Sequence, residues 1–342
     1  MKKKHNQLKY FLNFLLIAIV LSIVLYFSLK DNYQEITATI FKMNGLWVIV
    51  AIFALVFYRL CASFGHYQII KANGEKVSYL KCLQINFMIL FFHGVTPFAG
   101  GGQPMEVYFL HKEGIPVTKS TNITLQNFIV YQIALIATGL FALIYNRVFS
   151  VFPNDNLIKK LVVLGFLINT AVLVVTFLLS FGKKTNQFII QKGIHFLAKI
   201  KIVKEEEKVQ AKCQEYLQSF HDNAIELKKN RQVVIKTVLV NILGLMIMYS
   251  MPYPILRGMG VVINPFTIIT AIAYVMIIGS FIPIPGGTGG IEYSFIFFFQ
   301  YLISGSIVHA AMLVWRMISY YLGMIFGAIA LALYRKREKI CE

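Results

Sequence analysis

Apolar residues form long continuous runs along this chain, and short polar stretches separate the runs. Six runs are long enough to cross a membrane as a helix, for which about 20 residues are needed. They occupy residues 10–29, 46–70, 118–145, 157–181, 233–256 and 306–334. The pattern therefore predicts six full transmembrane helices.

Two further apolar stretches, residues 82–110 and 264–303, are interrupted by prolines and glycines, which do not continue a helix well. At 1.5 Å per residue, the arm formed by residues 82–96 covers about 22 Å of a hydrocarbon core of about 30 Å. Such an arm is too short for a complete span. We therefore predict two re-entrant helical hairpins, which return the chain to the side that it left.

Both interruptions contain the motif P-x-x-G-G-x-x-x-x-E-x-x-F. The first copy is Pro97, Gly100, Gly101, Glu106 and Phe109, and the second is Pro283, Gly286, Gly287, Glu292 and Phe295. With the hairpins in place, each half of the chain is predicted to run span, span, hairpin, span. The second half starts on the opposite face, so we predict an inverted repeat, the arrangement in which transporters build midplane sites.

The expected organisation is a single membrane domain over residues 1–342. Its first half is residues 1–147, and its second half comprises residues 148–182 and 232–337. Between them, residues 183–231 form a cytoplasmic insert whose apolar residues recur at spacings of three and four, as in an amphipathic helix. This insert either lies on the anionic inner leaflet or is a solvated helical link.

Composition agrees with a membrane protein. Hydrophobic residues make up 57% of the chain and charged residues 14%, whereas about a quarter of a soluble domain is charged. The fold class predicted is thus an all-α polytopic membrane protein with six full transmembrane helices, two re-entrant helical hairpins in an inverted repeat and a cytoplasmic helical insert.

The chain is strongly basic, with a net charge of +18 from 33 basic and 15 acidic residues. In a membrane protein this balance follows from the positive-inside rule and from attraction to anionic lipid head groups. The distribution of the basic residues predicts cytoplasmic N- and C-termini, with one hairpin entering from each side. We expect no nucleic acid partner.

Glu106 and Glu292 are the only acids inside the apolar parts of the chain. A charge in the bilayer interior costs roughly 3 kcal/mol, so such residues normally face a cavity or a partner. We therefore expect the two glutamates to line a translocation site. The alternative is that each one caps the free N–H groups where its half-helix restarts.

Two arginines, Arg59 and Arg316, lie inside predicted spans and are the candidate partners of these glutamates. The guanidinium fork can bind either a carboxylate or a lipid phosphate through two hydrogen bonds. Arg316 is near the middle of its span and is expected to act as a gate or phosphate contact, or else as a structural ion pair. Arg59 is expected somewhat nearer the cytoplasmic end.

The glycine clusters could also contribute to the site. Their backbone N–H groups can form anion-binding concavities, although glycine equally allows a turn to pack tightly against neighbouring helices. The candidate translocation residues from the two clusters are Gly100, Gly101, Gln103, Gly286 and Gly287.

No pattern in the sequence indicates a catalytic or metal centre. His66, His93 and His309 lie in or near apolar segments, and none has a second His, Asp or Glu at ligand spacing. Neither glycine cluster continues as G-K-[ST], so a phosphate loop for ATP is not supported. We expect no cofactor, no metal and no catalytic residue.

Three stretches together are fairly specific: TPFAGGGQPMEVYFLHKEG, PIPGGTGGIEYSF and the pair Trp315 and Arg316. In these, and in the order of its spans, the chain resembles the integral-membrane domain of the bacterial lysylphosphatidylglycerol synthase and flippase family. The resemblance implies a domain in the bacterial cell membrane that moves lipids between leaflets, with a role in resistance to cationic antimicrobial peptides. The sequence ends shortly after Arg337 without the transferase module of that family, so we expect that the chain is not an enzyme by itself.

Three hypotheses for the function follow. The first is a lipid translocase for an anionic or aminoacylated phospholipid, or a related lipid-linked substrate. The second is a membrane subunit that works with a separately encoded phosphatidylglycerol lysyltransferase. The third is an ion-coupled carrier of small solutes, in which the glutamates bind protons or sodium. The expected partner is a membrane phospholipid, and assembly as a homo-oligomer is compatible with all three.

Overall fold

The computed structural model describes residues 33–152, 156–181, 225–226, 228–280, 282–303 and 305–341. These residues form helices and connecting turns, with no strand among them. Five helices are long and apolar enough to span a membrane: Gly45–Ala72, Val117–Phe149, Lys160–Leu178, Arg231–Gly258 and Ser306–Lys336. They confirm five of the six predicted spans. The sixth, residues 10–29, and almost all of the insert at residues 183–231 lie outside the described residues.

The first part of the described chain comprises a short helix, a long helix, the first hairpin and a second long helix. Asn44 and Ser78 cap α3 and α4, each accepting a hydrogen bond from a backbone N–H of the first turn. Pro97 and the glycines after it end α4, and the chain makes a single 3-10 turn before helix resumes. The elements are α2 (Tyr33–Lys42), α3 (Gly45–Ala72), α4 (Tyr79–Val95), η1 (Pro97–Ala99), α5 (Gly102–Lys112) and α6 (Val117–Phe149).

The second part contains the second hairpin and a final long helix. Two of its predicted spans are irregular. Pro252 and Pro254 begin a separate short helix after Tyr249, and six residues near the middle of the last span form a π-helix. The elements are α7 (Asn156–Phe181), α10 (Arg231–Tyr249), α11 (Pro252–Gly258), α12 (Pro265–Gly279), η2 (Pro285–Gly287), α13 (Gly290–Phe299), α14 (Ser306–Arg316), η3 (Met317–Leu322) and α15 (Gly323–Cys341).

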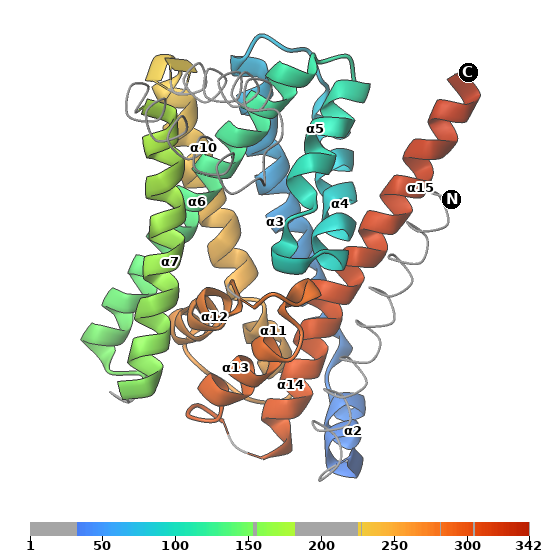
Figure 1. Cartoon of the computed structure of the whole chain (residues 1–342). Coiled ribbons are helices and arrows are strands. Elements are labelled where there is room, and N and C mark those ends of the chain that lie inside the picture. The colour runs from blue at the N-terminus through green and yellow to red at the C-terminus, as the bar shows by residue number, and fades with distance from the viewer. Residues whose placement is uncertain are drawn as a thin grey trace, which may run out of the picture.

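The two hairpins enter from opposite ends of the molecule and meet at mid-height (Figure 1). The first hairpin consists of α4, η1 and α5, and the second of α12, η2 and α13. Their turns contact each other directly, since η1 packs against η2 and α4 also touches η2. Both predicted helical hairpins are thus present, and their re-entrant topology stays a prediction. The division into halves at residue 147 stays a prediction.

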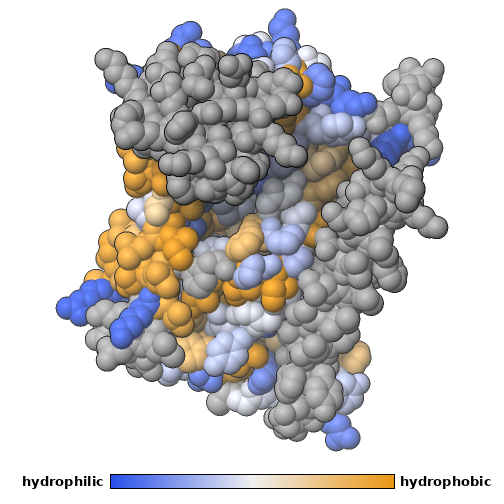
Figure 2. Space-filling model, in the orientation of Figure 1, coloured by the Kyte–Doolittle hydropathy of each residue, from blue (hydrophilic) through white to orange (hydrophobic). Residues whose placement is uncertain are grey.

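Long helices surround the hairpins. α3 packs on α10, where Gly65 allows Thr237 and Asn241 to approach its backbone. The last long helix contacts both hairpins, because α14 packs on α13 and α15 packs on α4. At mid-height, hydrophobic residues gather on the left of the face in Figure 2, and hydrophobic and hydrophilic residues mix nearer its centre. Leu164, Leu167 and Val175 on α7 are 50%, 57% and 53% exposed, as expected of side chains that face lipid.

The backbones of the two hairpins repeat, but not in the register of the sequence motif. Phe98 (φ 53°, ψ 18°) has the conformation of Gly286 (φ 65°, ψ 8°), and Ala99 that of Gly287. The half-helices then restart at Gly102 and Gly290. In this alignment equivalent positions are 188 residues apart, whereas the motif copies are 186 apart. The structural repeat is therefore displaced by two residues from the sequence repeat.

Candidate functional site

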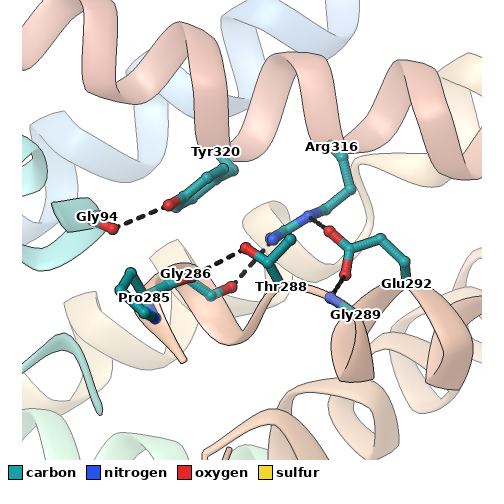
Figure 3. A network of polar contacts seen from close by, with 8 residues as sticks. All are labelled: Gly94, Pro285, Gly286, Thr288, Gly289, Glu292, Arg316 and Tyr320. Atoms are coloured by element: carbon teal, nitrogen blue, oxygen red, sulfur yellow. Dashed lines mark hydrogen bonds and ion pairs between the residues drawn. The ribbon is translucent and has the colours of Figure 1, made fainter. Parts of the chain in front are cut away.

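The polar centre of the second hairpin is a buried ion pair. Glu292, the third residue of α13, accepts a hydrogen bond from Nε of Arg316 through Oε1 at 2.6 Å (Figure 3). Glu292 is 4% exposed and Arg316 is 6% exposed. Arg316 is the last residue of α14, so the pair joins the restarting half-helix to the final long helix.

Both groups of this ion pair also bind the backbone of the turn. Oε2 of Glu292 accepts from the N–H of Gly289 at 2.7 Å, and Nη2 of Arg316 donates to the carbonyl of Gly286 at 2.9 Å. Within the turn, the hydroxyl of Thr288 donates to the carbonyl of Pro285. Glu292 therefore caps its half-helix, as the structural alternative expected, and also pairs with Arg316.

Tyr320 connects this centre to the first hairpin. The guanidinium of Arg316 stacks over its ring, with Cζ 4.5 Å from the ring centroid. Its hydroxyl donates to the carbonyl of Gly94 near the end of α4 at 2.8 Å (Figure 3). A Cβ at Gly286 would come within 2.3 Å of the tyrosine ring, so glycine is required there by space as well as by its positive φ. The second turn is thus fixed between Arg316 and Tyr320.

Glu106 lies in a separate cluster with different partners. It is the fifth residue of α5 and 4% exposed. Its Oε1 is 3.1 Å from Nε2 of the fully buried His66 on α3 and accepts from the amide of Asn127 on α6 at 3.3 Å. The distance to His66 is that of a hydrogen bond, but the imidazole N–H is not aligned with the carboxylate.

Asn86 on α4 fixes the imidazole of His66 from the other side. Its amide nitrogen donates to the carbonyl of Cys82 at 3.0 Å and lies 3.2 Å from Nδ1 of His66. Since the same nitrogen also donates to a carbonyl, it is the donor to Nδ1, which leaves the imidazole proton on Nε2, the nitrogen that lies 3.1 Å from Oε1 of Glu106. Four helices therefore meet around a single buried carboxyl group.

The prediction that the two glutamates are mirror equivalents is wrong in detail. Because the structural repeat is displaced by two residues, Glu292 is at the third position of its half-helix and caps it, whereas Glu106 is at the fifth. The third position of α5 is Pro104, whose side chain is uncharged and cannot cap the helix. Glu106 is consequently a further half-turn from the tip and pairs with His66 instead of with an arginine.

The glycines of the two motifs also differ in role. Gly286 and Gly287 have positive φ and are needed for the turn, whereas Gly100 and Gly101 have φ of −73° and −79°. The left-handed positions of the first turn are taken by the non-glycine residues Phe98 and Ala99. The first turn is exposed, with Phe98 at 61%, and the second is largely buried. Gln103 is half-buried at the second position of α5.

Arg59 is not a partner of either glutamate. It is the fifteenth of the 28 residues of α3 and so lies close to the midpoint of that helix. Its guanidinium stacks on the ring of Tyr58, with Cζ 4.4 Å from the centroid. Its Nε is buried and has no hydrogen-bond partner among the described residues.

Sequence reasoning named His66 but gave it no partner, and it did not single out Asn127 or Tyr320. His66 and Asn127 are 40 and 21 positions from Glu106, and Tyr320 is 226 positions from Gly94, so no short motif connects these residues to their partners. The apolar surroundings of His66 in its span could have indicated its role, because a buried imidazole needs a polar partner. Within the part of the chain that the structure describes, no three His, Cys, Asp or Glu residues are grouped as metal ligands.

Comparisons with known proteins agree with the fold. A protein of Archaeoglobus fulgidus called "UPF0104 membrane protein" is 24% identical over 339 residues, which cover 92% of this chain and 94% of that protein. The family model described as "Lysylphosphatidylglycerol synthase TM region" matches residues 13–327 and so includes both hairpins and Arg316. The chain belongs to the lysylphosphatidylglycerol synthase TM region family.

Proposed function

We propose that the protein translocates lipids, moving the polar head group of a phospholipid between leaflets past the two hairpin turns while the acyl chains stay in the bilayer. The observation that carries the proposal is the meeting of two broken helices at mid-height, with Glu292 and Arg316 buried there. Broken helices of this kind line substrate paths in transporters, because irregular backbone at membrane depth needs a protein or water-filled surrounding.

The contacts between the turns suggest how access could alternate. The turns are joined by the hydrogen bond from Tyr320 to Gly94 and by packing of η1 against η2. Separation of the turns on one side would open a polar route lined by the backbone of one hairpin, while the other hairpin closes the opposite side. The buried pair of Glu292 and Arg316 keeps the second turn intact during such a movement.

The name of the family supports a phospholipid as the cargo. It refers to lysylphosphatidylglycerol, so an anionic or aminoacylated phospholipid is the head group that we propose for this chain. A separately encoded transferase partner and a bacterial plasma membrane location stay predictions, as do the orientation of the termini and a homo-oligomeric state.

A leaflet-exchange assay tests the proposal. The purified chain is reconstituted in liposomes with a fluorescent phosphatidylglycerol, and dithionite reports the fraction of label in the outer leaflet. We expect exchange well above that of protein-free liposomes, and at least ten-fold slower exchange for Tyr320→Phe and for Glu292→Gln. Glu75→Gln, which breaks only the partly exposed pair with Lys119, is the matched control. Exchange no faster than in empty liposomes would refute the function.

The contact between His66 and Glu106 favours a second candidate function. A carboxyl group facing an imidazole in the interior can hold a proton that both groups share, as in the proton sites of ion-coupled carriers. Uptake of a small solute that depends on a pH gradient, and its loss in Glu106→Gln, would favour a carrier over a lipid translocase.

A further inference from the structure

Glu106 is a buried acid that no cation compensates. It is 4% exposed, and its two partners, Nε2 of His66 and the amide of Asn127, both contact Oε1, at 3.1 and 3.3 Å. No lysine or arginine of the described chain forms an ion pair with it, whereas Glu292 is paired with Arg316. An ionised Glu106 beside a neutral imidazole would leave one negative charge in the membrane interior, where an isolated charge is costly.

The hydrogen bonds of His66 prevent it from supplying the missing positive charge. The amide nitrogen of Asn86 donates to Nδ1 of His66 and to the carbonyl of Cys82, so the two contacts together fix the orientation of the amide. A second proton on the imidazole would occupy Nδ1 and face this amide donor. A proton that neutralises the pair therefore belongs on the carboxyl group of Glu106. Oε2, the oxygen that does not accept from Asn127, can carry it.

Other ionisable groups on the helices around Glu106 contact other partners. α5 packs on α4 and α6, and His66 lies on α3, which packs on α10. The thiol of Cys82 on α4 is buried and brings no positive charge. The contacts of the other groups are Lys81 with Glu113, Lys119 with Glu75, His93 with the carbonyl of Ala99, His111 with the carbonyl of Ile115, Tyr79 with the carbonyl of Leu60, and Arg59, Lys112 and Lys236 with the rings of Tyr58, Tyr108 and Phe64. Within the described residues, Glu106 thus has only neutral partners.

We propose that Glu106 is a proton-binding site that controls the position of the first hairpin, an inference that rests on the proposed translocase function. With its proton, the neutral carboxyl group joins α5 to His66 on α3 and to Asn127 on α6. Transfer of this proton to water leaves a carboxylate among neutral groups, so α5 moves away from α3 and α6 towards water, and lipid exchange is coupled to proton release. The proton belongs to one carboxyl group, whereas the carrier hypothesis shares it with the imidazole.

Infrared spectroscopy of the full chain in detergent at neutral pH tests the proton site without any transport. A protonated carboxyl group gives a C=O stretching band at higher frequency than amide and carboxylate groups, and this band shifts in heavy water. Glu106→Gln removes the acid and keeps the size of the side chain, and Glu106→Asp keeps an acid at a different distance from its partners. Glu75→Gln is the matched control, because Glu75 has the cation that Glu106 lacks, Lys119 at 2.7 Å.

We expect such a band in the wild type, its loss in Glu106→Gln, a shifted band in Glu106→Asp and no change in Glu75→Gln. Absence of the band from the wild type, or its persistence in Glu106→Gln, would overturn the inference. If Glu106→Gln fails to fold, the wild-type spectrum and the shift of the band in Glu106→Asp still decide.

The pH dependence of leaflet exchange tests the coupling. We expect exchange by the wild type to be at least ten-fold faster at alkaline than at mildly acidic pH, because Glu106 loses its proton, and exchange by Glu106→Gln to be equally slow at both. Equal wild-type rates, or a pH dependence that Glu106→Gln retains, would overturn the coupling. A carboxyl band that depends on Glu106, in a protein that shows no leaflet exchange, would support the proton site and refute translocation. Exchange without such a band would do the reverse.

Discussion

Replacing Glu292 by glutamine should lower the free energy of unfolding by about 3–5 kcal/mol, the usual cost of removing one partner of a buried ion pair. The substitution keeps the size of the side chain, so no cavity contributes. What remains is Arg316, 6% exposed, with its Nε no longer facing a carboxylate at 2.6 Å. The capping bond to Gly289 also changes from a carboxylate acceptor to a neutral one.

The measurement is reversible unfolding by denaturant titration in mixed micelles, read by circular dichroism. Arg316→Met and the double variant complete a cycle, and we expect a coupling energy between the two side chains at the upper end of about 0.5–3 kcal/mol. The matched control is Glu75→Gln. Its pair with Lys119 has a similar separation, 2.7 Å, but the lysine is 42% exposed, so about 0–1 kcal/mol should be lost.

Two results would refute this reasoning. One is a loss for Glu292→Gln no larger than for Glu75→Gln, which would mean that the charge of Arg316 is solvated despite its burial. The other is additivity of Glu292→Gln and Arg316→Met in the double variant, which would mean that the 2.6 Å contact is not energetically coupled.

The remaining predictions concern the turns and the packing around them, and each is read in the same unfolding titration. Ala99→Gly should stabilise the protein by about 1 kcal/mol by relieving a left-handed conformation, and an unchanged midpoint would contradict this. Gly286→Ala should destabilise it by about 1–3 kcal/mol, because φ is 65° and the new Cβ would meet Tyr320; full stability would show that the ring can move away. Tyr320→Phe should cost about 1 kcal/mol through the lost bond to Gly94, and no loss would mean that water replaces the hydroxyl. Gly65→Ala should cost about 1–3 kcal/mol, because its Cβ would lie 2.7 Å from a methyl group on α10; a neutral result would argue against tight packing of α3 on α10.

The hairpins could be predicted from the sequence because their evidence is local. Short apolar arms around a Pro and Gly break do not fit a full span, and both breaks occur where the structure has η1 and η2. The exact register could not be predicted in this way. A glycine permits a positive φ but does not require it, and in the first turn that conformation occurs at Phe98 and Ala99 and not at Gly100 and Gly101.

The charged residues of the candidate site could be predicted from the sequence, but which of these residues contact each other could not. Glu292 and Arg316 are rare charges in apolar segments, and both are found buried together. Which charge meets which depends on helix packing over long sequence separations. Glu106 lies two residues further along its half-helix than Glu292 and contacts His66 on α3, whereas Arg59 on the same helix stacks on an aromatic ring.

The π-helical segment Met317–Leu322 separates the part of the last helix that contacts the second hairpin from the part that contacts the first. A π-helix bonds i to i+5, so it holds more residues in each turn than the α-helix on either side. Conversion of this segment to α-helical bonding would displace the downstream residues by one position, which is a rotation of about 100° around the helix axis. The side of α15 that faces α4 is therefore set by the hydrogen bonding of six residues that begin directly after Arg316.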